Sequence, residues 1–241
     1  MNRTLLIDGD IIAYQYSSTV EHEVDWGDDV WSLWADAKEA QQLILQYLDI
    51  LVEETAADDF IFCFSDKDNF RKGISPTYKA NRKGKRKPVC YKAVTSWVED
   101  QFKTETWAGL EADDVMGILS TGSTISDETV IVSEDKDMKT IPGLLWRSGE
   151  MLSITEEEAD YNHLYQTLVG DSTDGYPGVR GIGDKRATEL LKNPTWDTVL
   201  KAFEKTGQTE EDALVQARLA RILRASDYDF KQNKPIMWSP E

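Results

Sequence analysis

The sequence predicts an α/β core built on a mostly parallel central sheet flanked by helices, followed by an all-helical C-terminal portion. In the first half of the chain, strand-like and helix-like segments alternate, which is typical of a parallel sheet covered on both faces. From about Ile154 onward the pattern becomes helical, and no internal repeat, low-complexity tract or Pro-rich linker interrupts the chain. We therefore expect a core over residues 1–153 and a helical subdomain over residues 154–241.

The expected elements follow this order. Short apolar strands are predicted over Thr4–Ile7, Phe60–Phe64 and Thr129–Val132. Core helices are predicted over Ala35–Glu54, Tyr91–Phe102 and Ala112–Leu119, the first of them with apolar residues at helical spacing. In the C-terminal portion, helices are predicted over Glu156–Leu168, Asp184–Leu191, Trp196–Lys205 and Glu210–Leu223.

An acidic, Trp-rich segment lies between Ser17 and Trp34. We interpret it as a helical cap whose Trp side chains pack on the core, because large aromatic residues are mostly buried. The alternative is a lid or a partner-binding site.

Size and composition exclude several classes of protein. With 241 residues and 40% hydrophobic side chains, the chain has enough material for a core. No apolar run approaches the roughly 20 residues needed to span a bilayer, so no membrane association is expected. The N-terminus lacks the pattern of a signal peptide. Two cysteines are too few for a disulfide scaffold, which indicates a reducing, cytoplasmic setting.

The net charge of −17 argues against binding to nucleic acid, but the charges are segregated. The stretch from Arg71 to Lys92, called here the basic segment, contains nine Lys and Arg residues and no Asp or Glu. It begins a gateway region that we place at about residues 71–103. The segment is either a contact surface for a polyanion or a solvated basic loop.

Carboxylates recur where strands end or helices begin. Asp8 and Asp66 follow the first two strands, Asp135 and Asp137 follow the third, and three acids lie at the predicted helix start near Ala112: Glu111, Asp113 and Asp114. Asp171 and Asp174 open a Gly-rich segment. Sites in open parallel sheets form at the carboxyl ends of strands, so most of these residues are expected at one edge. Individually, Asp135 is also explained as a helix N-cap and Asp171 as a turn residue.

A cluster of this kind indicates a metal site. Each close pair of carboxylates costs roughly 4 kcal/mol at an effective dielectric of about 20, so hard cations must neutralise them. Oxygen ligands supplemented by water suit Mg²⁺ or Mn²⁺, and two ions about 4 Å apart stabilise an in-line phosphoryl displacement by water. Neither of the two histidines has the neighbouring residues of a Ser-His-Asp catalytic triad. No Cys/His spacing supports a structural zinc site.

The segment from Gly178 to Ala187 predicts a tight turn that leads into a helix. It differs from a P-loop, because Asp184 stands where the Lys belongs and no strand precedes it. Backbone N–H groups at such a turn grip a phosphate without reading sequence, and Lys185 and Arg186 add positive charge. This is the pattern of a helix-hairpin-helix clamp on DNA, which we place at about residues 170–191.

Five motifs together resemble the flap endonuclease/5′-3′ exonuclease superfamily, and most closely the stand-alone 5′→3′ exonucleases of short-tailed bacteriophages. They are Ile7-Asp8-Gly9; Phe70-Arg71 followed by Tyr78-Lys79-Ala80-Asn81-Arg82; Glu111-Ala112-Asp113-Asp114; Ser133-Glu134-Asp135-Lys136-Asp137; and Gly170-Asp171-Ser172-Thr173-Asp174-Gly175 with the glycine hairpin. Each motif alone is weakly specific, but their order and spacing match along nearly the whole chain.

The resemblance implies a nuclease core of the PIN-like fold and a role for each motif. Nine acids match the metal-site carboxylates: Asp8, Asp66, Glu111, Asp113, Asp114, Asp135, Asp137, Asp171 and Asp174. Lys79 and Arg82 match the basic pair at the scissile phosphate, and Tyr78 matches a position that stacks on a terminal base. The remaining DNA contacts are expected from Arg71, Lys83, Lys85, Arg86, Lys87, Gly178, Gly181, Gly183, Lys185 and Arg186. Relatives often bind K⁺ at the hairpin.

The sequence departs from the family pattern at two positions. Asp10 adds a carboxylate where relatives carry a neutral polar residue, and Tyr176 replaces an aliphatic residue. The resemblance implies a metal-dependent 5′→3′ exonuclease and 5′-flap nuclease. Its expected substrates are duplex DNA with 5′ ends, flaps or junctions, and also RNA–DNA hybrids. We expect a monomer in the host cytoplasm that serves phage replication, recombination or host DNA breakdown. The rival hypotheses are a non-catalytic, structure-specific DNA-binding module and a PIN-type ribonuclease.

Overall fold

The fold is centred on a six-stranded sheet. The computed structural model describes residues 2–122 and 125–240. The strand order is β5-β4-β1-β6-β7-β8, and all neighbours are parallel except β7 and β8. The strands are β1 (Arg3–Asp8), β4 (Asp59–Cys63), β5 (Lys103–Glu105), β6 (Glu128–Val132), β7 (Gly143–Arg147) and β8 (Glu150–Ile154). The predicted mostly parallel sheet is confirmed, although β5, β7 and β8 were not predicted.

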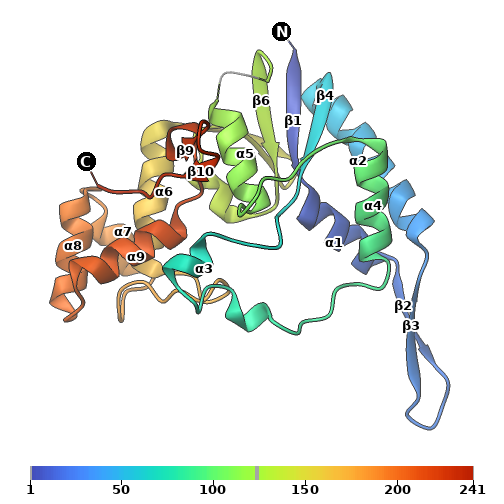
Figure 1. Cartoon of the computed structure of the whole chain (residues 1–241), viewed down its shortest axis with the longest axis horizontal. Coiled ribbons are helices and arrows are strands. Elements are labelled where there is room, and N and C mark those ends of the chain that lie inside the picture. The colour runs from blue at the N-terminus through green and yellow to red at the C-terminus, as the bar shows by residue number, and fades with distance from the viewer. Residues whose placement is uncertain (1, 123–124, 241) are drawn as a thin grey trace.

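Helices cover both faces of the sheet, as predicted (Figure 1). On one face lie α1 (Gly9–Thr19), α2 (Ala37–Thr55) and α4 (Tyr91–Gln101), and on the other lies α5 (Ala112–Thr121). Side chains alternate along β1, so Leu5 and Ile7 join the first core while Leu6 joins the second. Because β1 is buried on both sides, its apolar run has no polar alternation.

The C-terminal portion is helical and has its own small core around Phe203. It contains α6 (Glu156–Val169), α7 (Asp184–Leu190), α8 (Trp196–Lys205) and α9 (Glu210–Ala220). The prediction for the last helix was three residues too long. Residues 221–223 leave the helix because their backbone bonds Arg71 and Asp114 and passes over α5. The close approach requires glycine on α5, since a Cβ at Gly117 would lie 2.3 Å from the Leu223 carbonyl oxygen.

The last described residues form short elements that pack beside α5 (Figure 1). They are a 3₁₀ turn, η3 (Ala225–Asp227), and a two-stranded ribbon of β9 (Tyr228–Asp229) and β10 (Lys234–Pro235). Within the described ranges, none of the helices has the length and apolar character required to cross a membrane.

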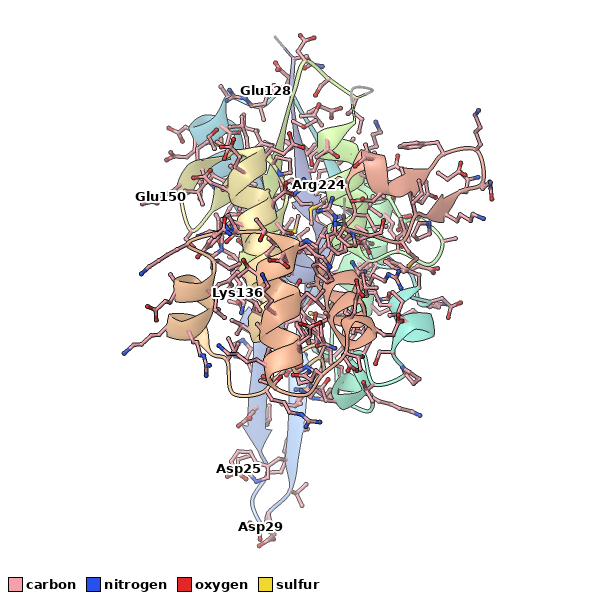
Figure 2. All side chains as sticks on the ribbon, turned by 90° about the vertical axis from the view of Figure 1, so that its left-hand side faces the viewer. Asp25, Asp29, Glu128, Lys136, Glu150 and Arg224 are labelled. Carbon is pink, nitrogen blue, oxygen red and sulfur yellow. The ribbon has the colours of Figure 1, made fainter. Side chains whose placement is uncertain are left out.

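The prediction of a helical cap between Ser17 and Trp34 was wrong. This segment forms an antiparallel hairpin of β2 (Glu21–Asp25) and β3 (Trp31–Ala35), which projects from the body of the molecule (Figure 2). Trp26, Trp31 and Trp34 are 69%, 58% and 56% exposed rather than packed on the core. The Gly27-Asp28-Asp29 turn has left-handed backbone, which reverses the chain and favours strands. Asp36 then caps α2.

Candidate active site

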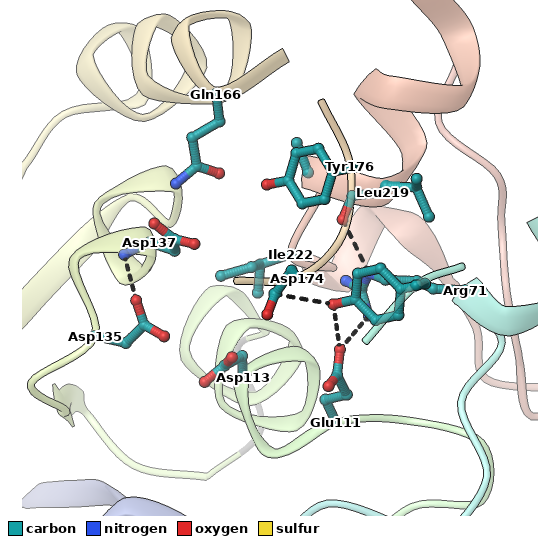
Figure 3. A pocket seen from close by; sticks show the side chains of 12 residues that line it. Arg71, Glu111, Asp113, Asp135, Asp137, Gln166, Asp174, Tyr176, Leu219 and Ile222 are labelled. Carbon is teal, nitrogen blue, oxygen red and sulfur yellow. Dashed lines mark hydrogen bonds and ion pairs between the residues drawn. The ribbon is translucent and has the colours of Figure 1, made fainter. Parts of the chain in front are cut away.

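The carboxyl edge of the sheet carries a small acidic pocket of about 20 Å³ (Figure 3). The pocket brings together five of the predicted acids from separate parts of the chain: Glu111 and Asp113 at the start of α5, Asp135 and Asp137 after β6, and Asp174 in the loop after α6. Asp8 ends β1 at the same edge and is 2% exposed. The predicted convergence at the strand ends therefore holds for these six residues.

Local backbone structure fixes the acids around the pocket. Asp8 caps α1, where its Oδ1 accepts from Ile11 N at 3.0 Å, and its Oδ2 accepts from the Ser133 hydroxyl at 3.0 Å. Asp135 caps η2 (Lys136–Thr140) by accepting from Asp137 N at 2.8 Å. The capping explanation and the functional one are therefore compatible, because capping holds each carboxylate in place.

Burial and mutual repulsion raise the pKa of several of these carboxyl groups. Burial, with Asp10 and Asp135 nearby, raises the pKa of Asp8 to about 7. Burial and the Asp135 charge likewise raise the pKa of Asp137 to about 7. The pKa of Asp113 lies well above its ordinary value because of burial, Asp8 and Asp135. Such shifts mark a site that binds protons or cations.

The donor set fits a hard divalent cation. It consists of carboxylate oxygens, and Asp137 Oδ1 is buried without a hydrogen-bond partner in the described part of the chain. Across residues 2–122 and 125–240, no three acidic, His or Cys side chains lie close enough together to enclose one ion. Mg²⁺ does not require such a cage, because it keeps several waters and is held by one or two carboxylates.

The two predicted catalytic cations lie at the rim of this pocket. Lys79 Nζ contacts Glu111 Oε1 and lies 3.5 Å from Asp174 Oδ2, while Arg82 Nη2 lies 2.5 Å from Asp174 Oδ1. Although burial alone would raise the pKa of Glu111, Arg71 and Lys79 lower it to about 2. Glu111 therefore stays ionised beside neighbours that bind protons.

The predicted roles of Arg71 and Asp114 require correction. Arg71 is 2% exposed, so it does not reach a phosphate, and Asp114 is 0% exposed. Both Asp114 oxygens lie 2.7 Å from the guanidinium and also accept from the Glu111 and Leu223 amides. All five guanidinium N–H groups have acceptors, the others being the Leu219 and Arg221 carbonyls and Glu111. This buried ion pair, called here the buried tie, links the gateway region to the helical subdomain. Asp114 is therefore not a metal ligand, and Arg71 is not a DNA contact.

Tyr78 and Asp66 also differ from expectation. Tyr78 is 4% exposed and its hydroxyl donates to Glu111 Oε2 at 2.8 Å, so its ring is not available for stacking on a base. Asp66 does not line the pocket, and its oxygens accept from the Lys67 and Gly109 amides. The resemblance implied a site role for both residues, but burial of Tyr78 and backbone hydrogen bonds to Asp66 determine what these side chains contact here.

A second cleft of about 300 Å³ adjoins the acidic pocket. Asp137 and Gln166 line both, and Asp171 belongs to the second cleft, with Lys136 and Lys139. Asp171 Oδ1 accepts from Thr173 N at 2.6 Å, which is the turn role considered as its alternative. Gln166 and Tyr176 both line the acidic pocket but were not predicted as site residues. A polar residue on a helix and a single aromatic residue carry no sequence signal for a pocket.

The glycine hairpin lies between α6 and α7, as predicted. A Cβ at Gly178 would lie 2.5 Å from Gly170 N, so the two ends of the loop pack backbone to backbone. Gly181 has φ +74° and open space around it, and Gly183 immediately precedes α7. Lys185 and Arg186 are exposed on the first turn of α7. Lys83, Lys85 and Lys87 are exposed in the basic segment, whereas Arg86 is paired with Glu21.

Metal-free protein is predicted to lose stability as the pH rises. The pKa of about 7 for Asp8 and Asp137 exceeds the ordinary 3.8, so between roughly pH 4 and 7 the folded state holds protons that the unfolded state has released. The free energy of unfolding therefore falls as pH rises through this window, and Mg²⁺ stabilises more above it than within it.

Thermal unfolding in chelator and in Mg²⁺ measures this dependence. His163, with its pKa lowered to about 3 by burial, acts oppositely below roughly pH 6.5. The diagnostic is therefore a smaller dependence on pH in Asp137→Asn than in the wild type. Identical profiles for the two proteins would show that the acid cluster is not the source.

Comparison with known proteins identifies relatives of this chain. The family profile described as 5′-3′ exonuclease, N-terminal resolvase-like domain, matches residues 3–158. The exonuclease of Escherichia phage T7 is 33% identical, with 98% of this chain and 93% of that protein covered. The exodeoxyribonuclease of Enterobacteria phage T3 is 31% identical over 98% and 92%. The fold is shared with the bacteriophage T5 D15 protein, co-crystallized with metal ions, at a TM-score of 0.67 and 16% identity over 91% of this chain and 89% of that one.

Proposed function

Since the chain belongs to the 5′-3′ exonuclease family, we propose that the acidic pocket is where it hydrolyses DNA, with two Mg²⁺ or Mn²⁺ ions held by its carboxylates. The chain is a nuclease of the 5′-3′ exonuclease and flap-nuclease type. The observation that carries the proposal is the group of buried acids with raised pKa, facing a basic pair at one sheet edge.

The proposed ligands are the acids whose charge the protein leaves uncompensated. They are Asp8, Asp113, Asp135 and Asp137. Three further acids that have cationic partners are proposed as ligands at the border: Glu111, Asp171 and Asp174. Divalent ions here would neutralise the cluster and stabilise both the attacking and the leaving oxygen of an in-line displacement by water. Their binding displaces the protons that Asp8 and Asp137 hold near neutral pH, so activity rises with pH in the same range.

Lys79 and Arg82 are proposed to bind the scissile phosphate. In the absence of DNA, Lys79 forms an ion pair with Glu111 and Arg82 forms one with Asp174, at the rim of the pocket. When those carboxylates turn to a metal ion, both cations become available to the phosphoryl oxygens, where negative charge increases in the transition state. Lys79 has left-handed backbone, with φ 52°, and its side chain leaves the basic segment to reach Glu111.

The substrate is proposed to be duplex DNA with a 5′ end, flap or junction, and also RNA–DNA hybrid. T5 D15 flap endonuclease has been crystallized in a pseudo-enzyme–product complex with DNA and metal ions. The exposed lysines of the basic segment attract the single strand, and the glycine hairpin holds the duplex through backbone amides, with K⁺ as a proposed ligand of that hairpin. We further propose that the protein acts as a monomer, in a phage-infected host cytoplasm, in replication, recombination or breakdown of host DNA.

Lys79→Ala is expected to lower kcat about 10²- to 10³-fold, the usual loss for one preorganised group that stabilises transition-state charge. Single-turnover cleavage of a 5′-labelled duplex in Mg²⁺ measures this loss. Lys72→Ala is the matched control, since Lys72 lies in the same segment, is exposed, and among the described residues its ammonium group hydrogen-bonds only the Lys67 carbonyl. Equal rates for both variants would remove Lys79 from the reaction.

A further inference from the structure

The exposed middle of the basic segment, residues 82–85, is fastened on both sides. At its N-terminal side, Lys79 N donates to the Asp174 carbonyl at 2.8 Å, and Asn81 Nδ2 donates to the Thr173 carbonyl at 3.1 Å. Between the fastenings, Lys83 and Lys85 are exposed and Gly84 has φ +82°. The stretch that would meet DNA is therefore a short free span between two fixed points.

Glu21 makes the second fastening. Its Oε2 accepts from Arg86 Nη1 at 2.8 Å and from Val89 N at 2.7 Å, and its Oε1 accepts from Arg86 Nη2 at 2.6 Å. The Glu21 side chain is 12% exposed, whereas that of Arg86 is 57% exposed. The hydrogen bond with Arg86, followed by that with Val89, lowers the pKa of Glu21 to about 2, so the carboxylate is ionised throughout the working range of pH.

The hairpin β2–β3 carries Glu21 at its root. Glu21 is the first residue of β2 and pairs with Ala35 of β3, just before α2 begins. The hairpin thus holds Glu21 at its root, while Asp25 and Asp29 lie at the far tip (Figure 2). A neighbouring contact supports the same end, since the Tyr91 hydroxyl donates to Asp10 Oδ1 at 2.9 Å and Asp10 Oδ2 accepts from Ser65 N at 2.9 Å.

The two fastenings differ in what happens to them during the reaction. The backbone and amide hydrogen bonds of the first fastening do not hold the Lys79 and Arg82 side chains. Those side chains are paired with carboxylates of the proposed metal site, so their ion pairs are exchanged when ions and DNA bind. Neither Glu21 nor Arg86 lines the acidic pocket, and their contact needs no exchange. Arg86 also has both terminal nitrogens on Glu21, which competes with the DNA contact expected from its sequence position.

We propose that Glu21 is a positioning residue for the nuclease reaction. Through Arg86 and Val89 it holds the C-terminal end of the basic segment, so that Lys79 and Arg82 remain over the acidic pocket after their carboxylate partners have turned to the metal ions. The proposal rests on the proposed function of that pocket. It also gives the β2–β3 hairpin a function, as the base from which the basic segment is held.

Glu21→Ala separates this role from a simple change of charge. We expect kcat to fall about tenfold, less than the roughly 100-fold cost of a 1 Å misplacement at the reacting atoms. KM for DNA should stay equal or decrease, because Arg86 is released and adds about one phosphate contact to the single strand. That contact steepens the dependence of binding on salt by roughly 0.7 in log–log slope.

Glu23→Ala is the matched control. Glu23 lies on the same strand and face, is exposed, and has no charged partner in the described ranges, so its removal changes the net charge equally. Hydrogen exchange over residues 83–90 should quicken in Glu21→Ala and stay unchanged in Glu23→Ala. Equal kcat and equal exchange in the two variants would overturn the proposal.

A double-mutant cycle tests whether Glu21 acts through Arg86. If it does, Arg86→Ala lowers kcat, and the double variant loses no more than Glu21→Ala alone. If Arg86→Ala instead raises KM while Glu21→Ala leaves kcat at the wild-type value, Arg86 contacts DNA directly and Glu21 has no positioning role. Absence of cleavage by the wild type would refute the function of the pocket, whereas unchanged exchange in Glu21→Ala would refute only the fastening.

Discussion

Asp137→Asn lowers kcat for DNA cleavage about 10²- to 10³-fold and at the same time raises the melting temperature of the metal-free protein. Activity falls because a proposed metal ligand loses its charge. Stability rises because Asp137 is held near Asp135 with its Oδ1 buried and without a partner in the described residues. An amide removes the like charge and supplies a donor to the neighbouring carboxylate.

Opposite signs for activity and stability distinguish this site from a damaged fold. The measurements are single-turnover cleavage in Mg²⁺ and thermal unfolding in chelator at about pH 8, above the pKa of about 7 of Asp8 and Asp137. Asp49→Asn, an exposed acid on α2, is the control with the same change of charge and should alter neither quantity. A variant with full activity, or with a lower melting temperature without metal, would contradict the assignment.

Arg71→Met is expected to lower the free energy of unfolding by about 3–5 kcal/mol, the cost of removing one partner from a buried ion pair. Asp114 would remain as an unpaired charge at 0% exposure, and two backbone carbonyls would lose their donors. For a chain of this size, the corresponding fall in melting temperature is roughly 6–20 °C.

Arg71→Lys should restore little of this stability, because one ammonium group cannot replace five donors in a planar arrangement. Lys72→Met, at the next and exposed position, should unfold like the wild type. Equilibrium unfolding in urea measures all three variants. A loss below about 1 kcal/mol in Arg71→Met would place the pair with ordinary surface ion pairs and refute its role as a buried tie.

The parallel core was predictable because its signals are local. The apolar runs of β1, β4 and β6 have no polar alternation, and Asp8 and Asp135 mark strand ends whether they cap helices or bind ions. The antiparallel pair β7–β8 was missed because its residues have mixed polarity and its edge strand is half exposed.

The errors came from tertiary contacts that a motif does not show. Arg71 and Tyr78 carry the residue types of a DNA contact, yet the approach of residues 219–223 encloses Arg71 and Glu111 binds Tyr78. The Trp-rich segment was assigned to the core because Trp is usually buried, whereas left-handed residues at Asp28 and Asp29 turn it into an exposed hairpin. Glu21 had no motif, and only its contacts across 65 residues identify its partner.

The metal-dependent 5′ nuclease activity is tested most directly by cleavage of one duplex labelled at its 5′ end and of an identical duplex labelled at its 3′ end. Each is incubated with Mg²⁺, with chelator, and with Asp135→Asn in place of the wild type. We expect early release of short 5′-labelled products that is lost in chelator and in the variant. Cleavage that persists in Asp135→Asn, or that starts from the 3′ label, would contradict it.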